Sequence, residues 1–269
     1  RSYQIIENLI IKFNSLKISI ITVAYNCKSV LNHCLDSVAA QSYDNIEHIV
    51  IDGASTDGTL SLLNSRRNNL AMIVSEPDDG IYDAMNKGIK LAKGDIIGFL
   101  NSDDFYASNE VLSRVASVFK DDPSLELCYS DLTYNDQVDT SRVIRYWKSS
   151  NFILGTFSKG WCPPHPTFFV RRSMYERYGN FDLSYSIASD IELMMRFLEI
   201  HKRNARYIPE LWVKMRMGGL SNKNIKNIVD QNLEVLRALR SHNLSANPIS
   251  FFANKIFLRG KQFFQRPIK

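Results

Sequence analysis

The carboxylates best placed to do chemistry in this sequence follow an apolar run near its centre. Residues 96–100 are long enough for a buried strand, and a polar stretch containing Asp103 and Asp104 follows at once. Acids at the carboxyl end of a buried strand lie where open α/β sheets place their ligands. Two adjacent carboxylates repel each other unless a positive charge lies beside them, and a divalent cation is the usual partner. The alternative is an Asp-rich turn that caps a helix expected at residues 108–120.

A second group of residues has the chemistry of a nucleobase site. Tyr25 and Asn26 end a β-branched run, and Asp52 ends the next one. An aromatic ring can stack on a base, and a carboxylate at the neighbouring strand end can accept an N–H from the base edge. Alternatively, Tyr25 is a core aromatic residue and Asp52 a turn or capping residue.

The segment SEPDDGIYDAMNKG adds polar residues after the third apolar run. Asp78 and Asp79 precede a glycine in a turn, while Asp83, Asn86 and Lys87 share one side of the following helix. This spacing places three polar side chains near the mouth of the predicted sheet. A solvated first helical turn is the alternative.

Alternating strands and helices are expected to position these groups. In the first half we expect strands at 18–25, 46–51, 70–74 and 96–100, and helices at 29–41, 59–67, 80–92 and 108–120. This alternation predicts a parallel, doubly wound α/β half.

The regular alternation of strands and helices ends after residue 125. We expect a strand at 125–131, a hairpin or extended excursion at 132–147, a loop at 148–164, a strand at 166–171, a helix at 191–201, an extended segment at 207–217 and a helix at 224–241.

Composition bounds the class of protein. The chain has 269 residues, of which 45% are hydrophobic, so it can form one large domain with an appendage. No apolar run is long enough to span a membrane, and no secretory signal is expected. The four cysteines lack metal-binding spacing, and the absence of such spacing favours free thiols. Of the net charge of +5, residues 221–269 carry +7, which suggests an anionic partner for the tail.

The ordered motifs ISIITVAYN, IDGASTDGT and SEPDDGIYDAMNKGIKLAKGDIIGFLNSDD resemble those of family 2 glycosyltransferases of the bacterial polysaccharide type. The resemblance covers residues 17–215 and implies a GT-A fold, in which a nucleotide-binding half and an acceptor-binding half share one mixed sheet. We therefore expect an N-terminal arm at 1–16, a catalytic domain at 17–220 divided at 124/125, and a C-terminal helical extension at 221–269.

The resemblance also implies a donor site for a UDP-sugar and a divalent metal, Mg²⁺ or Mn²⁺. Asp103 matches the metal-binding acid of the family's DxD motif, whereas the first acid of that motif is Asn101 here. Asp52 matches the acid that reads uracil. The residues expected at the nucleotide-sugar are Val23, Tyr25, Asp52, Asp79, Asn86, Ser102 and Asp104.

Transfer to an acceptor hydroxyl also needs a base. Asp190 opens a helix with an apolar face and matches the family's catalytic Asp, although it could be only an N-cap. Trp161 and His165 could form a platform and a polar contact for the acceptor sugar. A structural histidine is the alternative for His165.

The end of the chain, FFANKIFLRGKQFFQRPIK, has its own pattern. On a helical wheel, five apolar residues, four of them aromatic, share one arc, with Lys255, Arg259 and Arg266 along its border. This pattern predicts a helix lying on an anionic membrane surface, with core packing or a dimer interface as the alternative.

Taken together, the sequence predicts an inverting, metal-dependent glycosyltransferase that uses a UDP-sugar and acts on a lipid-linked or polysaccharide acceptor. We expect it at the cytoplasmic face of a bacterial membrane, as a peripheral protein that can form oligomers. A nucleotidyltransferase would need a glycine-rich basic loop after the first strand, and TVAYNCKSV is not one. A non-catalytic nucleotide-sugar-binding protein remains a further alternative. Nucleic-acid binding is not expected, because no stacking groove or reader motif accompanies the basic tail.

Overall fold

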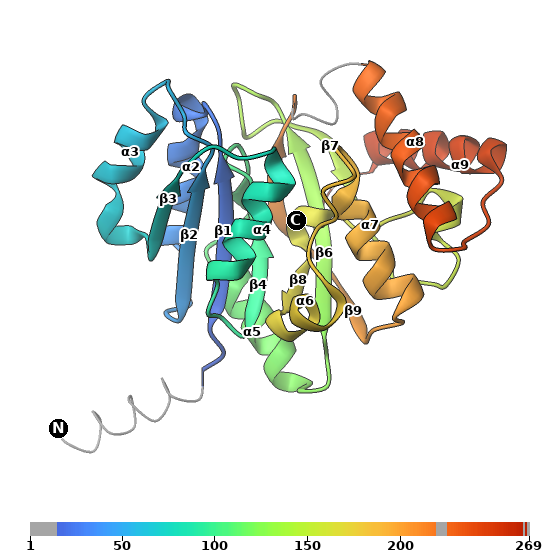
Figure 1. Cartoon of the computed structure of the whole chain (residues 1–269), viewed down its shortest axis with the longest axis horizontal. Coiled ribbons are helices and arrows are strands. Elements are labelled where there is room, and N and C mark those ends of the chain that lie inside the picture. The colour runs from blue at the N-terminus through green and yellow to red at the C-terminus, as the bar shows by residue number, and fades with distance from the viewer. Residues whose placement is uncertain (1–14, 219–224, 266, 268–269) are drawn as a thin grey trace.

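The computed structural model describes residues 15–218, 225–265 and 267, so most of the expected N-terminal arm and Arg266 lie outside the described residues. A single mixed sheet runs through the middle of the molecule, with helices on both faces (Figure 1). Its strands are β1 (Ile18–Ala24), β2 (Ile46–Asp52), β3 (Met72–Ser75), β4 (Ile96–Phe99), β5 (Phe105–Tyr106), β6 (Leu127–Asn135), β7 (Val143–Trp147), β8 (Phe169–Arg171) and β9 (Ala205–Arg216). The helices are α2 (Lys28–Ala39), α3 (Thr59–Ser65), α4 (Ile81–Leu91), α5 (Val111–Asp121), α6 (Arg172–Tyr178), α7 (Ser189–Met195), α8 (Ile225–Ser241) and α9 (Pro248–Phe264).

The strand order confirms the predicted parallel half and adds an antiparallel half to it. The order is β3-β2-β1-β4-β8-β6-β9-β5, with β7 paired to β6. The strands β1 to β4 are mutually parallel, whereas β8 is antiparallel to both β4 and β6. The α/β class is therefore confirmed, and β8 joins the two halves through one continuous sheet.

The core forms because alternate residues of each strand point to opposite faces of the sheet. In β1, Ile21 and Val23 pack with α4 on one face, while Ile18 and Ile20 pack with α2 and α5 on the other. At the seam between the halves, Gly98 of β4 leaves room for a ring, since a Cβ there would lie 2.4 Å from Cε1 of Phe169.

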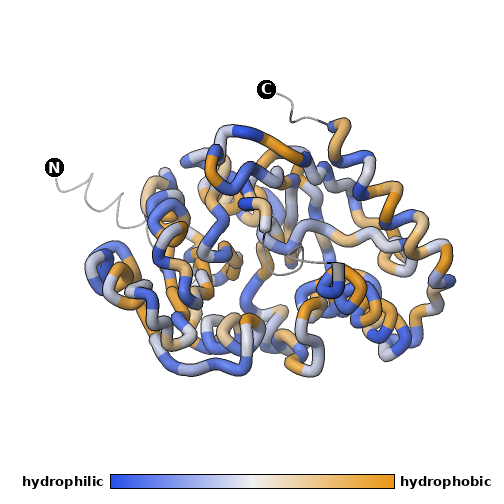
Figure 2. The backbone as a smooth tube through the Cα atoms, turned by 90° about the horizontal axis from the view of Figure 1, so that it is seen from above, coloured by the Kyte–Doolittle hydropathy of each residue, from blue (hydrophilic) through white to orange (hydrophobic). Residues whose placement is uncertain are grey.

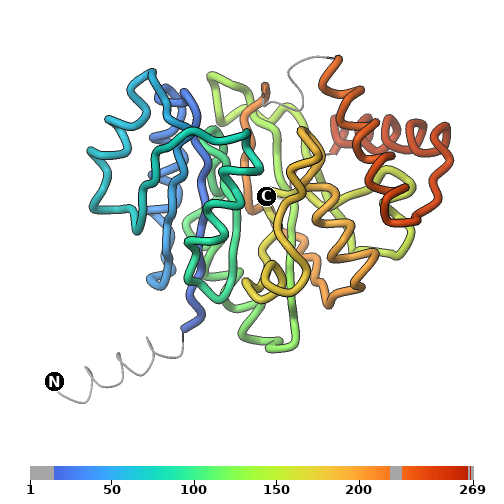
Figure 3. The backbone as a smooth tube through the Cα atoms, viewed as in Figure 1, coloured from blue at the N-terminus to red at the C-terminus, as the bar shows by residue number. Residues whose placement is uncertain are grey.

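The C-terminal helices lie at the end of the molecule away from α2 and α3 (Figures 1 and 3). Apolar and polar residues alternate along α8 and α9 (Figure 2). α8 packs on α7, and α9 packs on β7 and on the turn Phe157–Lys159. Among the described residues, no helix is both long and apolar enough to cross a membrane.

The buried His48 of β2 makes stability depend on pH. Its Nε2 lies 3.0 Å from Thr22 Oγ1, and burial lowers the pKa of the imidazole to about 4. Unfolding restores the ordinary value of about 6.5, so the unfolded chain binds more protons between these two values and stability falls as the pH drops. From pH 8 to pH 5 we expect this residue to remove about 2 kcal/mol of unfolding free energy. Urea unfolding of His48→Gln should show a pH dependence smaller by that amount, and equal slopes in the two proteins would contradict the prediction.

Candidate active site

A single large cavity opens at the carboxyl ends of the parallel strands. Its volume is about 1440 Å³. Pockets for one drug-sized ligand range up to about 1000 Å³, so this cavity has room for two substrates. Of the described residues that line it, three carry carboxylates: Asp78, Asp103 and Asp190.

One end of the cavity is lined by the last residues of β1 and by the turn that follows it. Val23 and Tyr25 line the wall, and the Tyr25 side chain is 67% exposed. The turn that follows is fixed because Asn26 Oδ1 accepts the N–H of Thr56 at 2.9 Å, and Ser55 Oγ accepts the N–H of Asn26 at 2.8 Å. An exposed ring on a fixed turn suits stacking on a planar ligand.

Asp52 does not line the cavity in this structure, so its expected contact with the base stays a prediction. It is fully buried and lies outside the cavity wall. One carboxylate oxygen accepts the Ser55 hydroxyl at 2.5 Å, and the other accepts the Ser55 N–H at 3.1 Å and the Ser75 hydroxyl at 2.6 Å. Both oxygens are thus engaged in holding the loop after β2 against β3.

The carboxylate of Asp78 lines this end of the cavity, near Gly53 and Tyr25. A Cβ at Gly53 would lie 2.5 Å from Asp78 Oδ2 and 3.3 Å from Cδ2 of Tyr25. Asp78 Oδ1 accepts the N–H of Gly80 at 3.0 Å, which orients the carboxylate. The sequence analysis placed Asp78 only in a turn; the signal was the glycine after Asp52, which leaves space for another side chain.

Two further residues expected at the donor lie outside the cavity wall. Asp79 is exposed, and its N–H donates to Asp83 Oδ2 at 3.2 Å. The Asn86 amide exchanges two hydrogen bonds with the backbone of Phe181, at 2.9 and 3.0 Å. Asn86 therefore ties α4 to the segment that leads into α7.

The two acids of the segment after β4, Asp103 and Asp104, lie in different surroundings. Asn101, Ser102 and Asp103 line the cavity, whereas Asp104 is fully buried and accepts Asn101 Nδ2 at 3.2 Å. Burial raises the pKa of Asp104, and the charge of Asp103 raises it further. The described residues contain no group of three or more His, Cys, Asp or Glu side chains that could hold a metal by themselves.

The oxygens beside Asp103 nevertheless fit a hard cation that shares its coordination with a ligand. Asn101 Oδ1 is buried and has no hydrogen-bond partner among the described residues. An amide oxygen and a carboxylate are suitable ligands for Mg²⁺ or Mn²⁺, and Mg²⁺ commonly takes the remaining ligands from phosphates and water. Asn101 in place of an acid thus still supplies an oxygen.

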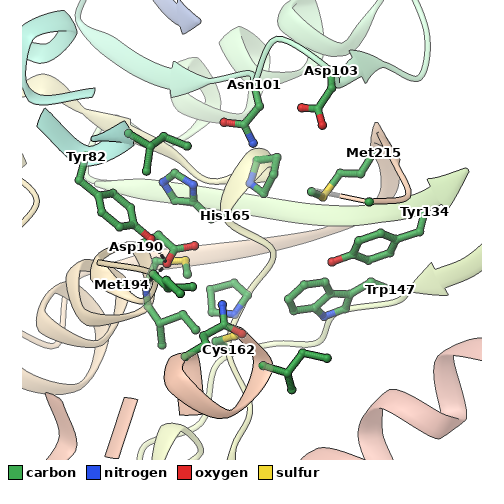
Figure 4. A pocket seen from close by; sticks show the side chains of 18 of the residues that line it. Tyr82, Asn101, Asp103, Tyr134, Trp147, Cys162, His165, Asp190, Met194 and Met215 are labelled. Carbon is green, nitrogen blue, oxygen red and sulfur yellow. Dashed lines mark hydrogen bonds between the residues drawn. The ribbon is translucent and has the colours of Figure 1, made fainter. Parts of the chain in front are cut away.

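Asp190 lies on another wall of the cavity from Asp103 (Figure 4). It is in the first turn of α7, and its Oδ1 accepts the Tyr82 hydroxyl at 3.0 Å and the Ile191 N–H at 2.9 Å. Glu234 of α8 accepts the N–H groups of residues 186, 187 and 188 at 2.9–3.0 Å. A residue of the C-terminal extension therefore fixes the start of the helix that presents Asp190.

Both residues expected at the acceptor line the cavity and are also packed by aromatic rings. His165 is buried, with its ring 5.5 Å from that of Phe99 and 5.6 Å from that of Phe181, and burial lowers its pKa. Trp161 packs edge-on against Phe157, at 5.8 Å between ring centroids. Neighbouring rings thus hold both residues in the cavity wall.

The sequence analysis missed an aromatic pair on the wall across from Asp190 (Figure 4). The rings of Tyr134 and Trp147 stack at 6.4 Å with an interplanar angle of 8°, and both line the cavity. No local sequence pattern predicts this stacked pair, because the two rings meet only when β6 and β7 fold into a hairpin.

The C-terminal helices supply the remaining wall, in line with the core-packing alternative for the tail. Phe252, Lys255, Leu258, Arg259 and Gln262 of α9 line the cavity, and Phe251 is fully buried. The predicted aromatic arc is thus divided, since Phe252 faces inward while Phe257 and Phe264 are exposed.

Comparison with known proteins points to one family. The sequence model of "Glycosyl transferase family 2" matches residues 19–179. A PGL/p-HBAD biosynthesis glycosyltransferase from Mycobacterium bovis is 33% identical over 209 residues, which are 76% of this chain and 78% of that protein. WfaP from Escherichia coli, named as a UDP-Glc:alpha-D-GlcNAc-diphosphoundecaprenol beta-1,3-glucosyltransferase, is 26% identical over 82% of this chain and 86% of its own.

Solved structures with the same fold are more distant in sequence. S. aureus TarS 1-349 in complex with UDP-GlcNAc aligns with a TM-score of 0.61 and 17% identity, over 90% of this chain and 71% of that one. The mannosyltransferase PcManGT from Pyrobaculum calidifontis, in complex with GDP-Man and Mn²⁺, aligns with a TM-score of 0.64 and 19% identity, over 91% of this chain and 70% of that one. The alignment with the longer TarS chain covers 43% of it. These similarities establish the GT-A fold.

Proposed function

This chain belongs to glycosyl transferase family 2, and we propose that it is an inverting glycosyltransferase that moves a sugar from a UDP-sugar to a hydroxyl of a lipid-linked or polysaccharide acceptor. The distribution of carboxylates around the cavity is the observation that supports this most directly. Asp78 lies with Tyr25 at the end suited to a base, Asp103 follows β4, and Asp190 lies on a separate wall. Each acid has a different task in such a reaction.

The proposed reaction has one displacement step. Asp190 takes the proton of the acceptor hydroxyl, the hydroxyl oxygen bonds to the anomeric carbon, and the bond to the nucleoside diphosphate breaks. Because the acceptor oxygen attacks on the side opposite the leaving group, this single displacement inverts the configuration at the anomeric carbon. A divalent cation bound by Asn101 and Asp103 would stabilise the departing diphosphate. The complexes of TarS with UDP-GlcNAc and of PcManGT with GDP-Man and Mn²⁺ are consistent with a nucleotide-sugar in a site of this fold.

A donor panel tests the proposal. The protein is incubated with UDP-sugars and Mg²⁺ or Mn²⁺ in the absence of acceptor, and slow hydrolysis to UDP is measured. We expect one UDP-sugar to be hydrolysed faster than the others. Binding of every UDP-sugar without turnover would indicate a non-catalytic binding protein, and release of inorganic diphosphate from a nucleoside triphosphate with a sugar phosphate would indicate a nucleotidyltransferase.

We predict that Asp78, with Tyr25, recognises the base. Removing a charge-assisted hydrogen bond costs about 1.5–3 kcal/mol, so Asp78→Ala should weaken UDP binding by about 10- to 150-fold. Asp79→Ala is the matched control, since this neighbouring acid is exposed and lies outside the cavity wall. Isothermal titration with UDP measures both. A loss confined to Asp79→Ala would place Asp79 at the nucleotide, as expected from the sequence, and would remove Asp78 from it.

We further propose that the outward face of α9 lies on a membrane surface. Ile249, Phe257 and Phe264 share this face and are 82%, 71% and 89% exposed, and Ile256, which is 72% exposed, lies at its border and also lines the cavity. Exposed apolar residues on one helix face, in a tail rich in Lys and Arg, suit a bilayer that contains anionic lipids.

We therefore expect Phe257→Ser/Phe264→Ser to reduce co-sedimentation with vesicles of phosphatidylglycerol and phosphatidylcholine by at least about tenfold, because each lost phenyl group contributes about 1.5–3 kcal/mol when buried. Val138→Ser/Leu183→Ser removes two exposed apolar side chains elsewhere and should leave vesicle binding unchanged. Unchanged binding of the Phe variant would show that the face covers something else, such as a second copy of the chain.

A further inference from the structure

The inward face of α9 carries cations beside its apolar residues. It directs Lys255 and Arg259 into the cavity, where Arg145 of β7 joins them. An amphipathic helix on a soluble domain normally buries its apolar side. Here two cations are turned inward while Phe257 and Phe264 are left outside. Cations that line a cavity favour an anionic occupant.

Two of these cations, Arg145 and Lys255, form no ion pair with a carboxylate in the described part of the chain. Arg145 is 6% exposed, and among the described residues neither Arg145 nor Lys255 lies within 4.0 Å of a carboxylate oxygen. The Arg145 guanidinium carbon lies 3.8 Å from the centroid of the Tyr134 ring, a contact that recovers only part of the hydration lost on burial. Burial lowers the pKa of both Arg145 and Lys255, and the positive charge of Arg259 lowers both further.

Unpaired polar atoms surround the same part of the cavity. Ser149 Oγ, Asn232 Oδ1 and Gln262 Oε1 are buried without a hydrogen-bond partner in the described chain, and all three residues line the cavity. A buried polar atom without a hydrogen-bond partner destabilises the fold unless a ligand or a water molecule supplies the hydrogen bond. The two amide oxygens can accept hydroxyl groups of a sugar, and the serine hydroxyl can donate to an anion.

The cations lie on the acceptor side of the cavity. Lys255 packs at Gly160, where a Cβ would lie 3.1 Å from the lysine Cβ, and it interacts electrostatically with Cys162 and Asp190. Figure 4 shows Cys162 across the cavity from Asp103, so this wall is separate from the expected place of the donor diphosphate.

We propose that Arg145, Lys255 and Arg259 bind the phosphate group that joins the acceptor sugar to its lipid. This inference rests on the proposed function, and it narrows the acceptor to a sugar carried on a lipid phosphate or diphosphate. Guanidinium and ammonium groups are the usual partners of phosphate oxygens. The sugar would then lie between the cations and Asp190, and the lipid would leave the cavity beside the outward face of α9.

The test is a titration with the donor site already filled. With UDP and Mg²⁺ at saturating concentrations, calorimetry measures the binding of inorganic pyrophosphate and of farnesyl diphosphate. We expect both to bind the wild-type protein, and farnesyl diphosphate to bind at least about tenfold more tightly, because its chain reaches apolar surface. Arg145→Gln/Lys255→Gln should weaken both by at least about tenfold. The matched control is Lys120→Gln/Arg240→Gln, which removes two exposed charges and should bind both probes as the wild type does.

Several outcomes would overturn the inference. The anion site would be excluded if pyrophosphate does not bind the wild-type protein, or if it binds Arg145→Gln/Lys255→Gln with unchanged affinity. Equal affinities for pyrophosphate and farnesyl diphosphate would exclude a lipid phosphate as the ligand. If the double variant does not fold, Lys255→Met keeps the side-chain length without the charge and should show the same weakening. UDP binding and UDP-sugar hydrolysis by the wild-type protein are measured in parallel. If these are retained while pyrophosphate does not bind, only the acceptor inference fails; their absence would refute the proposed function itself.

Discussion

Asp190→Asn is expected to lower the rate of sugar transfer by about 10²- to 10⁴-fold, the usual contribution of a general base. The amide has nearly the shape of the carboxylate and can still accept the Tyr82 hydroxyl, which lies 3.0 Å from Asp190 Oδ1. The variant should therefore keep its fold and its affinity for UDP, but it cannot take the proton of the acceptor hydroxyl. Single-turnover transfer and calorimetry with UDP measure the two effects separately.

The exposed Asp182 provides the matched control for this prediction. Its Oδ1 accepts the Ser184 N–H at 2.9 Å, and an asparagine can accept the same hydrogen bond. Asp182→Asn should transfer sugar at the wild-type rate. Transfer by Asp190→Asn at that rate would remove Asp190 from the reaction and leave it as an N-terminal residue of α7.

The parallel half of the fold could be predicted because its signals are local. Buried parallel strands are apolar along their whole length, and each is followed by a helix with a regular apolar face. The predicted strand and helix limits there agree with the structure to within three residues. The two-residue β5 carries no such signal, because it exists only through its pairing with Lys214 and Val213 of β9.

The surroundings of Asp52 show what local sequence patterns do not predict. A sequence shows that an acid follows a strand, but the direction of its side chain depends on the turn that follows. Here Ala54 has a φ of 59° in that turn, and Ser55 and Ser75 hold the carboxylate away from the cavity. Asp78, 26 positions later, comes to face Tyr25 only through tertiary structure.

The C-terminal helices show the same limit at a larger scale. An apolar arc on a helical wheel predicts an amphipathic helix but does not indicate what covers each face. Phe251 is buried and Phe264 is exposed, although both belong to α9. The contact from Glu234 to the start of α7 spans 46–48 residues, and no local pattern predicts it. The extension therefore contributes to the wall of the cavity and to the start of α7.

Asp103→Asn is expected to reduce transfer by about 10²- to 10³-fold, as removal of a group that stabilises developing charge does. The side chain lines the cavity beside the unpaired Asn101 Oδ1, whereas the adjacent Asp104 is fully buried and lies outside the cavity wall. Asp104→Asn therefore makes the same chemical change one position away, and its amide oxygen can still accept the hydrogen bond from Asn101 Nδ2.

Calorimetric titration with MnCl₂ in the presence of UDP provides a readout that is independent of activity. We expect Asp103→Asn to lose most of its Mn²⁺ affinity, because a neutral amide replaces the one cavity-facing carboxylate at this site. Asp104→Asn should retain Mn²⁺ binding and change mainly the free energy of unfolding. If Asp104→Asn loses the metal and Asp103→Asn keeps it, the two acids exchange their assigned tasks, and the loop after β4 must rearrange when the nucleotide-sugar binds.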